Sequence, residues 1–298
     1  MKKFIVLFVL GISLFGFSYQ VFAQAAQCTD SDNSQVVNGV LRLGADRLVR
    51  GTVRGRSRVT GRQDSAADRC MPNGTLMEYF CANATDIGGS TVRCQQGESC
   101  VNGVCMTQVV LNDCGTPAGG WKNATKYLLN RDLVSPSRSN SCFKIGEHNV
   151  ILSGIVLDCQ EHSIRTAEQT GPGVGSVSGT MIEIRSANNI AIQNCHIEGH
   201  SGFETGISIS FGPIEDIQIS NNEISNEEYG ISVGLEGEGT LRNINISNNH
   251  VCDNSTAFVC GAPQVLEGVR GNGNSFEGEV EACPGGWPAE NVNYDRCQ

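Results

Sequence analysis

The chain has 298 residues, among them 36 glycines and 14 cysteines, and aromatic residues make up only 6% of it. This composition favours turns and β structure and argues against a mostly helical protein. The net charge of −10 is unevenly distributed. Residues 28–105 carry nine arginines against eight acidic residues, whereas residues 113–298 carry ten basic against twenty-three acidic residues. This contrast predicts a boundary near residues 106–113.

The N-terminus has the pattern of an export signal. Lys2 and Lys3 precede an apolar run over residues 4–17, and the small residue Ala23 closes the segment. We predict a signal peptide over residues 1–23 and a mature protein that is secreted, periplasmic or held at the cell surface. An uncleaved membrane anchor is the alternative, because the apolar run approaches the length of a membrane span. After cleavage we expect no contact with a membrane.

All fourteen cysteines lie beyond this segment, and an even number in an exported chain favours disulfide bonds. Zinc ligation is the alternative, but no CxxC pair occurs. We expect the first six to pair among themselves, because the region that holds them is too poor in large apolar side chains to build a core; they are Cys28, Cys70, Cys81, Cys94, Cys100 and Cys105. Nearness in sequence suggests two further bonds, Cys142 with Cys159 and Cys252 with Cys260.

Residues 24–112 are predicted to form a cysteine-rich β module. Short alternating stretches, such as residues 49–53 and 76–80, indicate small hairpins. The opening Cys28-Thr29-Asp30-Ser31-Asp32 and the closing Cys100-x4-Cys105 resemble a cysteine module of exported archaeal and bacterial surface proteins. That resemblance implies no particular activity.

Two features of the module have an alternative, ligand-binding interpretation. Asp30 and Asp32 offer carboxylates to Ca²⁺, but two fall short of the six to eight oxygens that the ion prefers, so an Asx turn is favoured. Eight arginines between Arg42 and Arg69 would suit a polyanion. Acidic residues are interspersed among them, which favours a solvated hairpin face, and we expect no nucleic-acid partner.

The C-terminal region, residues 113–298, contains an internal repeat. Three segments, residues 189–197, 216–224 and 243–251, match at offsets of 27 residues. In each, Ile alternates with polar residues as a half-buried strand requires, and Gly-Ile-x-Ile stretches supply a second strand. Such units bury their apolar faces only by stacking. We therefore predict five or six rungs, with Ile192, Ile219 and Ile246 in one interior column and an amide ladder at the turn formed by Asn194, Asn221 and Asn248.

These Ile-x-Ile-x-Asn-Asn-x-Ile and Gly-Ile-x-Ile repeats resemble those of the right-handed parallel β-helix superfamily, which includes pectate lyases, polygalacturonases and NosD-like proteins. The resemblance covers roughly residues 113–276 and implies an all-β fold, a right-handed parallel β-helix preceded by the small disulfide-rich module. It is specific for fold and poor for function.

Glycan binding or a surface scaffold role is the function that we favour, with an extracellular polysaccharide or cell-surface glycan as the partner. The alternative is an enzyme, a polysaccharide lyase or glycoside hydrolase. Hydrolysis needs facing carboxylates, but the column of Asp216 holds Asn189 and Asn243. Resemblance to the pectate lyase family would imply Asp or Glu ligands to Ca²⁺ with an Arg or Lys base, but Arg185 aligns with Ser210 and Gly234 and no Arg cluster joins it. We name no catalytic residue and no firm cofactor.

A divalent cation site is a third hypothesis. In the 27-residue register His196, Glu223 and His250 share one outward column, and Glu198 and His200 flank the first of them. Imidazoles with carboxylates suit Zn²⁺ or Cu²⁺, and the resemblance to copper-handling β-helix proteins adds to this. The alternative is that the outward face of a sheet is polar without binding any ligand.

Overall fold

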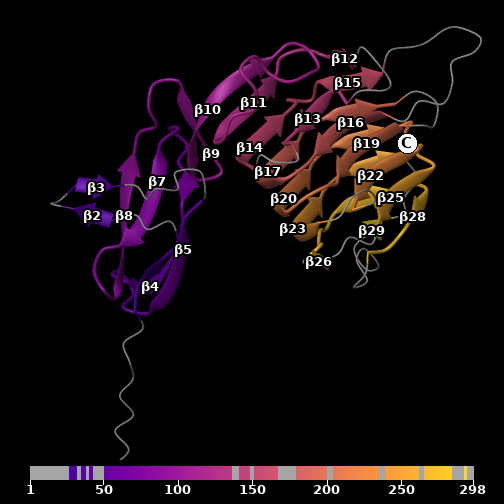
Figure 1. Ribbon diagram of the computed structural model, residues 1–298. Helices are drawn as coiled ribbons and strands as arrows, with labels where there is room; N and C mark the ends of the chain where they lie inside the picture. Colours follow the sequence, from indigo (N-terminus) through magenta and orange to yellow (C-terminus); the bar gives the residue numbers. More distant parts are fainter. Residues whose placement is uncertain are drawn as a thin grey trace, which may run out of the picture.

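The structure is a computed structural model that describes residues 27–31, 35–37, 40–42, 50–135, 141–147, 151–166, 179–199, 204–234, 239–261, 265–283 and 292–293. All regular elements in these ranges are β-strands (Figure 1). The predicted signal peptide, residues 1–23, lies outside them. Within the same ranges no helix is long and apolar enough to cross a membrane.

The N-terminal module is built on a twisted sheet in the order β1-β4-β8-β7-β6, with β5 paired to β4. A separate hairpin is formed by β2 and β3. The strands are β1 (Thr29–Asp30), β2 (Gln35–Val37), β3 (Val40–Arg42), β4 (Thr52–Ser57), β5 (Gln63–Ala67), β6 (Arg69–Cys70), β7 (Leu76–Cys81) and β8 (Asp86–Val92).

The six cysteines of the module pair among themselves, as predicted. The bonds are Cys28–Cys81, Cys70–Cys100 and Cys94–Cys105. Few large side chains of the module are buried, among them Val53, Leu76 and Phe80. Three covalent links therefore supplement a small core.

The rest of the chain winds into a parallel β-helix with three sheets. Sheet 1 contains β9 (Glu98–Val101), β10 (Val104–Leu111), β11 (Thr125–Leu129), β14 (Leu152–Asp158), β17 (Ala187–Gln193), β20 (Ile214–Ser220), β23 (Thr240–Ser247) and β26 (Val265–Glu267). Sheet 2 contains β12 (Leu133–Ser135), β15 (Ser163–Thr166), β18 (His196–Glu198), β21 (Glu223–Ser225), β24 (His250–Cys252), β27 (Asn274–Phe276) and β29 (Val292–Asn293). Sheet 3 contains β13 (Phe143–Ile145), β16 (Gly179–Ile184), β19 (Glu204–Ile209), β22 (Tyr229–Val233), β25 (Thr256–Cys260) and β28 (Glu279–Val280).

The predicted register is confirmed. Ile192 pairs with Ile219 and Ile219 with Ile246, and all three side chains are fully buried. The prediction of five or six rungs was too low, because sheet 2 has seven strands and the helix therefore has about seven turns. The additional turns lie at the two ends, where the sequence no longer repeats the Ile-x-Ile motif.

The predicted amide ladder is displaced by one residue. Asn194, Asn221 and Asn248 form a column at the turn, but each has a positive φ, between 54° and 55°, a conformation that Asn tolerates better than most residues. The hydrogen-bonded ladder runs through the buried residues that follow: the Asn222 amide donates to Asn249, and the Asn249 amide donates to Asn274. The first column is therefore selected by backbone conformation and the second by side-chain hydrogen bonding.

The two disulfides suggested for the β-helix were wrong. The structure contains Cys114–Cys142, Cys159–Cys195 and Cys260–Cys283, and Cys252 is bonded to a residue other than Cys260. Nearness in sequence misleads here, because Cys252 ends β24 in sheet 2 whereas Cys260, eight positions later, ends β25 in sheet 3. Cys159 and Cys195 lie instead on successive turns, where stacking brings their Cα atoms to 4.7 Å.

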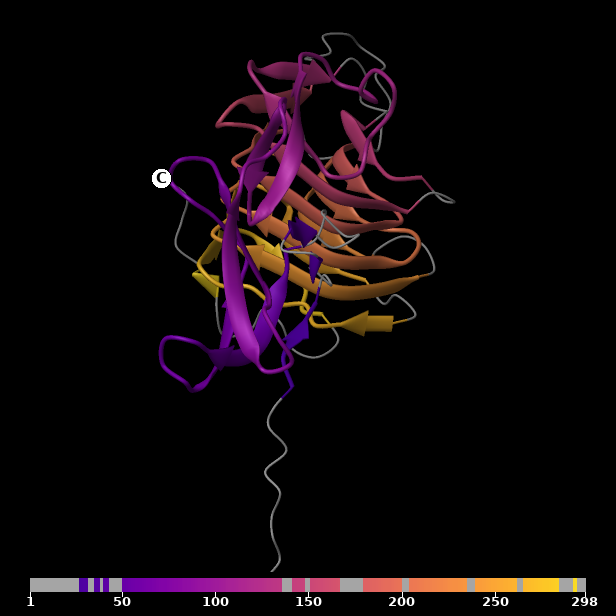
Figure 2. The same ribbon diagram turned by 90° about the vertical axis from the view of Figure 1, so that its left-hand side faces the viewer.

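The hairpin of β9 and β10 joins the module to the β-helix. β10 pairs in parallel with β11 and antiparallel with β9, so sheet 1 continues across residue 112. Val104 and Met106 also pack on Val156 and Ala191, which face outward from β14 and β17. The hairpin therefore lies against the outer face of sheet 1, and the rest of the module stands beside that face (Figures 1 and 2).

Asp158 ties the outer face of sheet 1 to the turn that follows it. Its carboxylate accepts a hydrogen bond from the Asn194 amide at 2.9 Å and lies 2.7 Å from the Lys126 ammonium. Burial alone raises the pKa of Asp158, but these two partners outweigh burial, so the pKa lies below its ordinary value. Because the pKa of Asp158 is lower in the folded than in the unfolded chain, its ionised carboxylate stabilises the fold at pH values above the unfolded-state pKa. This stabilisation is lost as the pH falls through the folded-state pKa.

We therefore expect Asp158→Asn to unfold at lower urea concentration than wild type at pH 7. The difference should shrink as the pH falls below about 4, the ordinary pKa of Asp. Urea titrations from pH 7 to pH 3 measure it. An equal loss of stability at both pH extremes would show that the substitution acts through packing and not through charge.

Candidate functional site

The outer face of sheet 1 presents side chains in columns because the strands are in parallel register. One column runs Val156, Ala191, Gln218 and Asn245, and another runs Ser153, Asn188, Glu215 and Arg242. Neighbouring strands lie about 4.8 Å apart. The columns therefore repeat polar groups at a regular short spacing along the helix axis.

A third column lies between these two and is defined by its backbone conformation. Gly154, Asn189, Asp216, Asn243 and Gly268 all have positive φ, between 53° and 70°, within or beside their strands. Left-handed backbone favours Gly, Asn and Asp at such positions. Backbone conformation thus explains why this column contains Asn and Asp. The presence of Asp216 in it is therefore no sign of a row of catalytic carboxylates.

These columns form a groove beside the N-terminal module. One hollow, of about 430 Å³, is polar and crosses β17, β20 and β23; its lining includes Asn188, Glu215, Asp216, Gln218, Asn243, Asn245 and Arg270. A second hollow of about 210 Å³ continues it beneath the β9–β10 hairpin, where Val104, Met106 and Ala191 make the wall more apolar. Arg50, Asn189 and Gln218 line both hollows. The two are therefore parts of one groove.

Side chains in the groove have free hydrogen-bonding capacity. Within the described ranges, the amides of Asn188, Gln218 and Asn245 make no hydrogen bond to other protein groups, whereas the buried amides of Asn222 and Asn249 do. Each amide offers both a donor and an acceptor. The two acidic groups of the groove, Glu215 and Asp216, are matched by the guanidinium groups of Arg50 and Arg270. The groove is therefore close to neutral although the β-helix as a whole is acidic.

The 27-residue repeat aligns Asp216, Asn189 and Asn243 in one column, but it does not indicate the groove. Its floor follows from the 27-residue register, which already aligns Ala191, Gln218 and Asn245. Its wall comes from the module, through Arg50 and Asn102. No periodic signal marks these two residues, because their position depends on how the module docks.

The structure brings part of the proposed cation site together. His196 pairs in register with Glu223 and Glu223 with His250, as predicted. The His196 ring contacts two carboxylates, with Nδ1 at 3.2 Å from Glu223 and Nε2 at 2.9 Å from Glu161. In the described part of the chain no group of three or more His, Cys, Asp or Glu side chains is arranged to hold a metal ion. Glu198 pairs with Ser225 across the next strand, and His200 lies outside the described residues, as does Asp32 of the suggested Ca²⁺ pair.

Arg185, the residue considered for lyase chemistry, is engaged by its neighbours. Its guanidinium forms an ion pair with Glu183 and lies 4.4 Å from the centroid of the Phe211 ring. Trp121, one of the two tryptophans, packs edge-on against Tyr127 and Phe143 and covers one end of the core. Neither Arg185 nor Trp121 lines the groove.

The fold and the groove define a class: a disulfide-bonded parallel β-helix protein with a cysteine-rich module docked on the outer face of one sheet. The seven-turn helix is consistent with the resemblance noted in the sequence. Comparison with protein-family models, with curated proteins and with solved structures finds no match. The class therefore stands on the structure alone.

Proposed function

We propose that this protein is an exported glycan-binding protein whose groove on sheet 1 holds an extended polysaccharide segment. The observation that carries the proposal is the row of unsatisfied amides, Asn188, Gln218 and Asn245, in a hollow of about 430 Å³. Amide side chains both donate to and accept from hydroxyl groups. An extended sugar chain presents such hydroxyls at a repeat similar to the spacing of the rungs.

The charge of the groove favours a neutral segment over a strongly anionic one. Residues 113–298 carry a large excess of acidic groups, which repels a polyanion at long range. Inside the groove, however, the lining acids Glu215 and Asp216 are balanced in number by the cations Arg50 and Arg270.

The disulfide bonds favour an oxidising extracellular location. In the described ranges, seven cysteines from Cys114 onward and the six of the module are disulfide-bonded.

Hydrolysis of the bound glycan is a second candidate function, favoured by the presence of two carboxylates in the same groove. Glu215 and Asp216 are adjacent and exposed on β20. Glycoside hydrolases use a pair of carboxylates as acid and base or nucleophile. If the groove hydrolyses its ligand, Glu215→Gln will abolish release of reducing ends and leave glycan binding within about threefold of wild type. Equal release by this variant and by wild type would eliminate Glu215 as a catalytic group.

The binding function is tested on a glycan array with the full mature chain. We expect wild type to bind at least one class of glycan, and Gln218→Ala/Asn245→Ala to bind it at least about tenfold more weakly, which corresponds to about 1.4 kcal/mol. Neither residue has positive φ or is buried, so the double variant should fold normally. Gln96→Ala is the matched control, because Gln96 is an exposed amide that does not line the groove. Equal binding by the double variant and wild type would contradict the proposal.

A further inference from the structure

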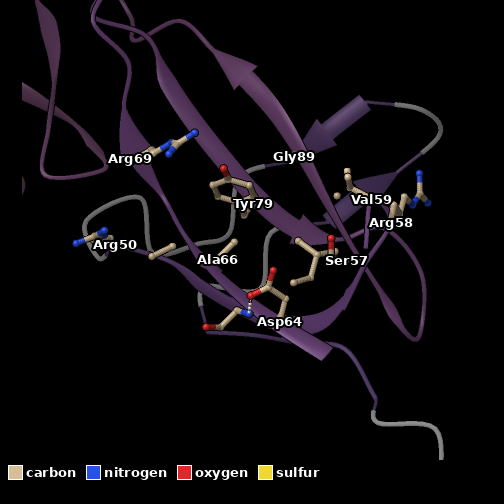
Figure 3. Close-up of a pocket in the computed structure, with 13 residues that line it drawn as sticks. Arg50, Ser57, Arg58, Val59, Asp64, Ala66, Arg69, Tyr79 and Gly89 are labelled. Carbon is tan, nitrogen blue, oxygen red and sulfur yellow. Dashed lines mark hydrogen bonds between the residues drawn. The ribbon is translucent and has the colours of Figure 1, made fainter. Parts of the chain in front are cut away.

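A third hollow, of about 550 Å³, lies within the N-terminal module itself (Figure 3). It opens between the β4–β5 hairpin and strands β7 and β8. Small residues on both sides leave it open: Ser65, Ala66 and Ala67 on β5, and Gly88 and Gly89 on β8. A Cβ at Gly89 would contact the Tyr79 ring at 3.4 Å, so the glycine leaves that part of the ring clear.

Three arginines line this hollow against a single carboxylate. Arg50 and Arg69 stand at one end, close to Tyr79, and Arg58 stands at the other (Figure 3). The Nε of Arg50 donates to the backbone oxygen of Asp68, the residue before Arg69, which ties the Arg50 side chain to the segment that carries Arg69. Asp68 is itself held by the backbone amides of Gly51 and Tyr79, at 2.9 and 2.7 Å. The arginine end of the hollow is therefore built on a rigid support.

Asp64 lies between the two ends, below Tyr79 in Figure 3. Its Oδ1 accepts a hydrogen bond from the Ser65 amide at 2.8 Å, and among the described residues its other oxygen has no protein partner. A carboxylate repels a bare inorganic anion but accepts hydrogen bonds from hydroxyl groups. The hollow thus offers arginines to bind a ligand carboxylate, Asp64 to accept hydrogen bonds from ligand hydroxyls, and the aromatic ring of Tyr79 as a contact surface.

We infer that this hollow is a binding site for an acidic sugar, a uronic acid unit. The sugar carboxylate lies toward Arg69 and Arg50, its hydroxyls toward Asp64 and Ser65, and its ring toward Tyr79. Guanidinium groups bind carboxylates with strong, charge-assisted hydrogen bonds. The site goes beyond the proposed function and does not depend on the groove of sheet 1, although Arg50 lines both.

The test is a titration of the isotopically labelled mature chain, followed by backbone amide NMR signals, with methyl galacturonoside and with its neutral counterpart methyl galactoside. We expect the acidic sugar to shift the signals of Tyr79, Gly88 and Gly89 saturably, with at least tenfold higher affinity than the neutral sugar. Arg69→Ala should lower that affinity at least tenfold. Arg93→Ala, which removes the same charge from an exposed position outside the hollow, should change it less than twofold.

Asp64→Ala and sodium sulfate separate a sugar site from a simple anion site. Removal of Asp64 should weaken binding of the acidic sugar and strengthen binding of sulfate, because only the sugar has hydroxyls to donate. Tighter binding of both probes, equal effects of Arg69→Ala and Arg93→Ala, or no saturable shift would each overturn the inference. If the acidic sugar gives no saturable shift but the mature chain still binds glycans on the array through Gln218 and Asn245, only this inference is rejected. If the acidic sugar binds but the array shows no binding that depends on Gln218 and Asn245, only the proposed function is rejected.

Discussion

Ile219→Asp is expected to prevent stable folding of the β-helix. Ile219 is fully buried and pairs with Ile192 and Ile246 in the middle of the interior column of sheet 1. A carboxylate at this position has no polar partner, so the substitution should cost at least about 4 kcal/mol. A domain is stabilised by only about 5–15 kcal/mol, so a loss of this size removes roughly a quarter to four-fifths of that stability. Thermal unfolding followed by circular dichroism measures the effect.

Gln218→Asp is the matched control for this substitution. Gln218 is the preceding residue on β20 and points to solvent. The same change there should alter stability by about 0.5 kcal/mol or less. Similar unfolding temperatures for the two variants would show that the register assigned to β20 is wrong.

Asn249→Ala should have the second largest effect, a loss of about 3–5 kcal/mol. The Asn249 oxygen accepts hydrogen bonds from the backbone and side-chain amides of Asn222, at 3.1 and 2.9 Å, and its own amide donates to Ile219 and Asn274. Alanine removes all four of these bonds, although the Asn222 side-chain amide still donates to Ile192 and the Asn274 oxygen still accepts from the backbone amide of residue 249. Each buried group that is left without a partner costs about 1–3 kcal/mol. Urea denaturation at neutral pH measures the loss.

Asn248→Gly provides the comparison for the ladder. Asn248 is exposed and has a φ of 54°, which glycine adopts readily. We expect a change within about 1 kcal/mol. A larger loss at Asn248 than at Asn249 would place the stabilising ladder in the column first predicted from the sequence.

The repeating part of the fold could be predicted because two periods coincide in it. Ile192, Ile219 and Ile246 alternate with polar residues in each strand and recur every 27 residues, so the sequence identifies both the buried face and the stacking. The amide ladder was misplaced by one residue because two successive Asn columns look alike in the sequence. Only the structure separates the column selected by positive φ from the buried column that forms hydrogen bonds.

The features that depend on tertiary docking could not be predicted. Arg50 and the β9–β10 hairpin come from a part of the chain without repeats, yet they form one wall of the groove. The contact of His196 with Glu161 was also not anticipated, because Glu161 lies in a turn outside the repeated strands. Pairing of Cys260 with Cys283 likewise requires knowledge of which strands stack. Local pattern thus determines the rungs, whereas the groove arises where two different parts of the chain meet.

Chemical-shift mapping with the oligosaccharide that gives the strongest array signal tests the glycan-binding groove most directly. We expect the largest shifts at the backbone amides of Asn188, Gln218 and Asn245, on the outer face of sheet 1. The outward residues of sheet 3, Glu183, Ser208 and Ser232, pair in the same register and provide the internal reference. Their signals should stay unchanged. Shifts confined to sheet 3, or spread equally over both sheets, would contradict a glycan site in the groove.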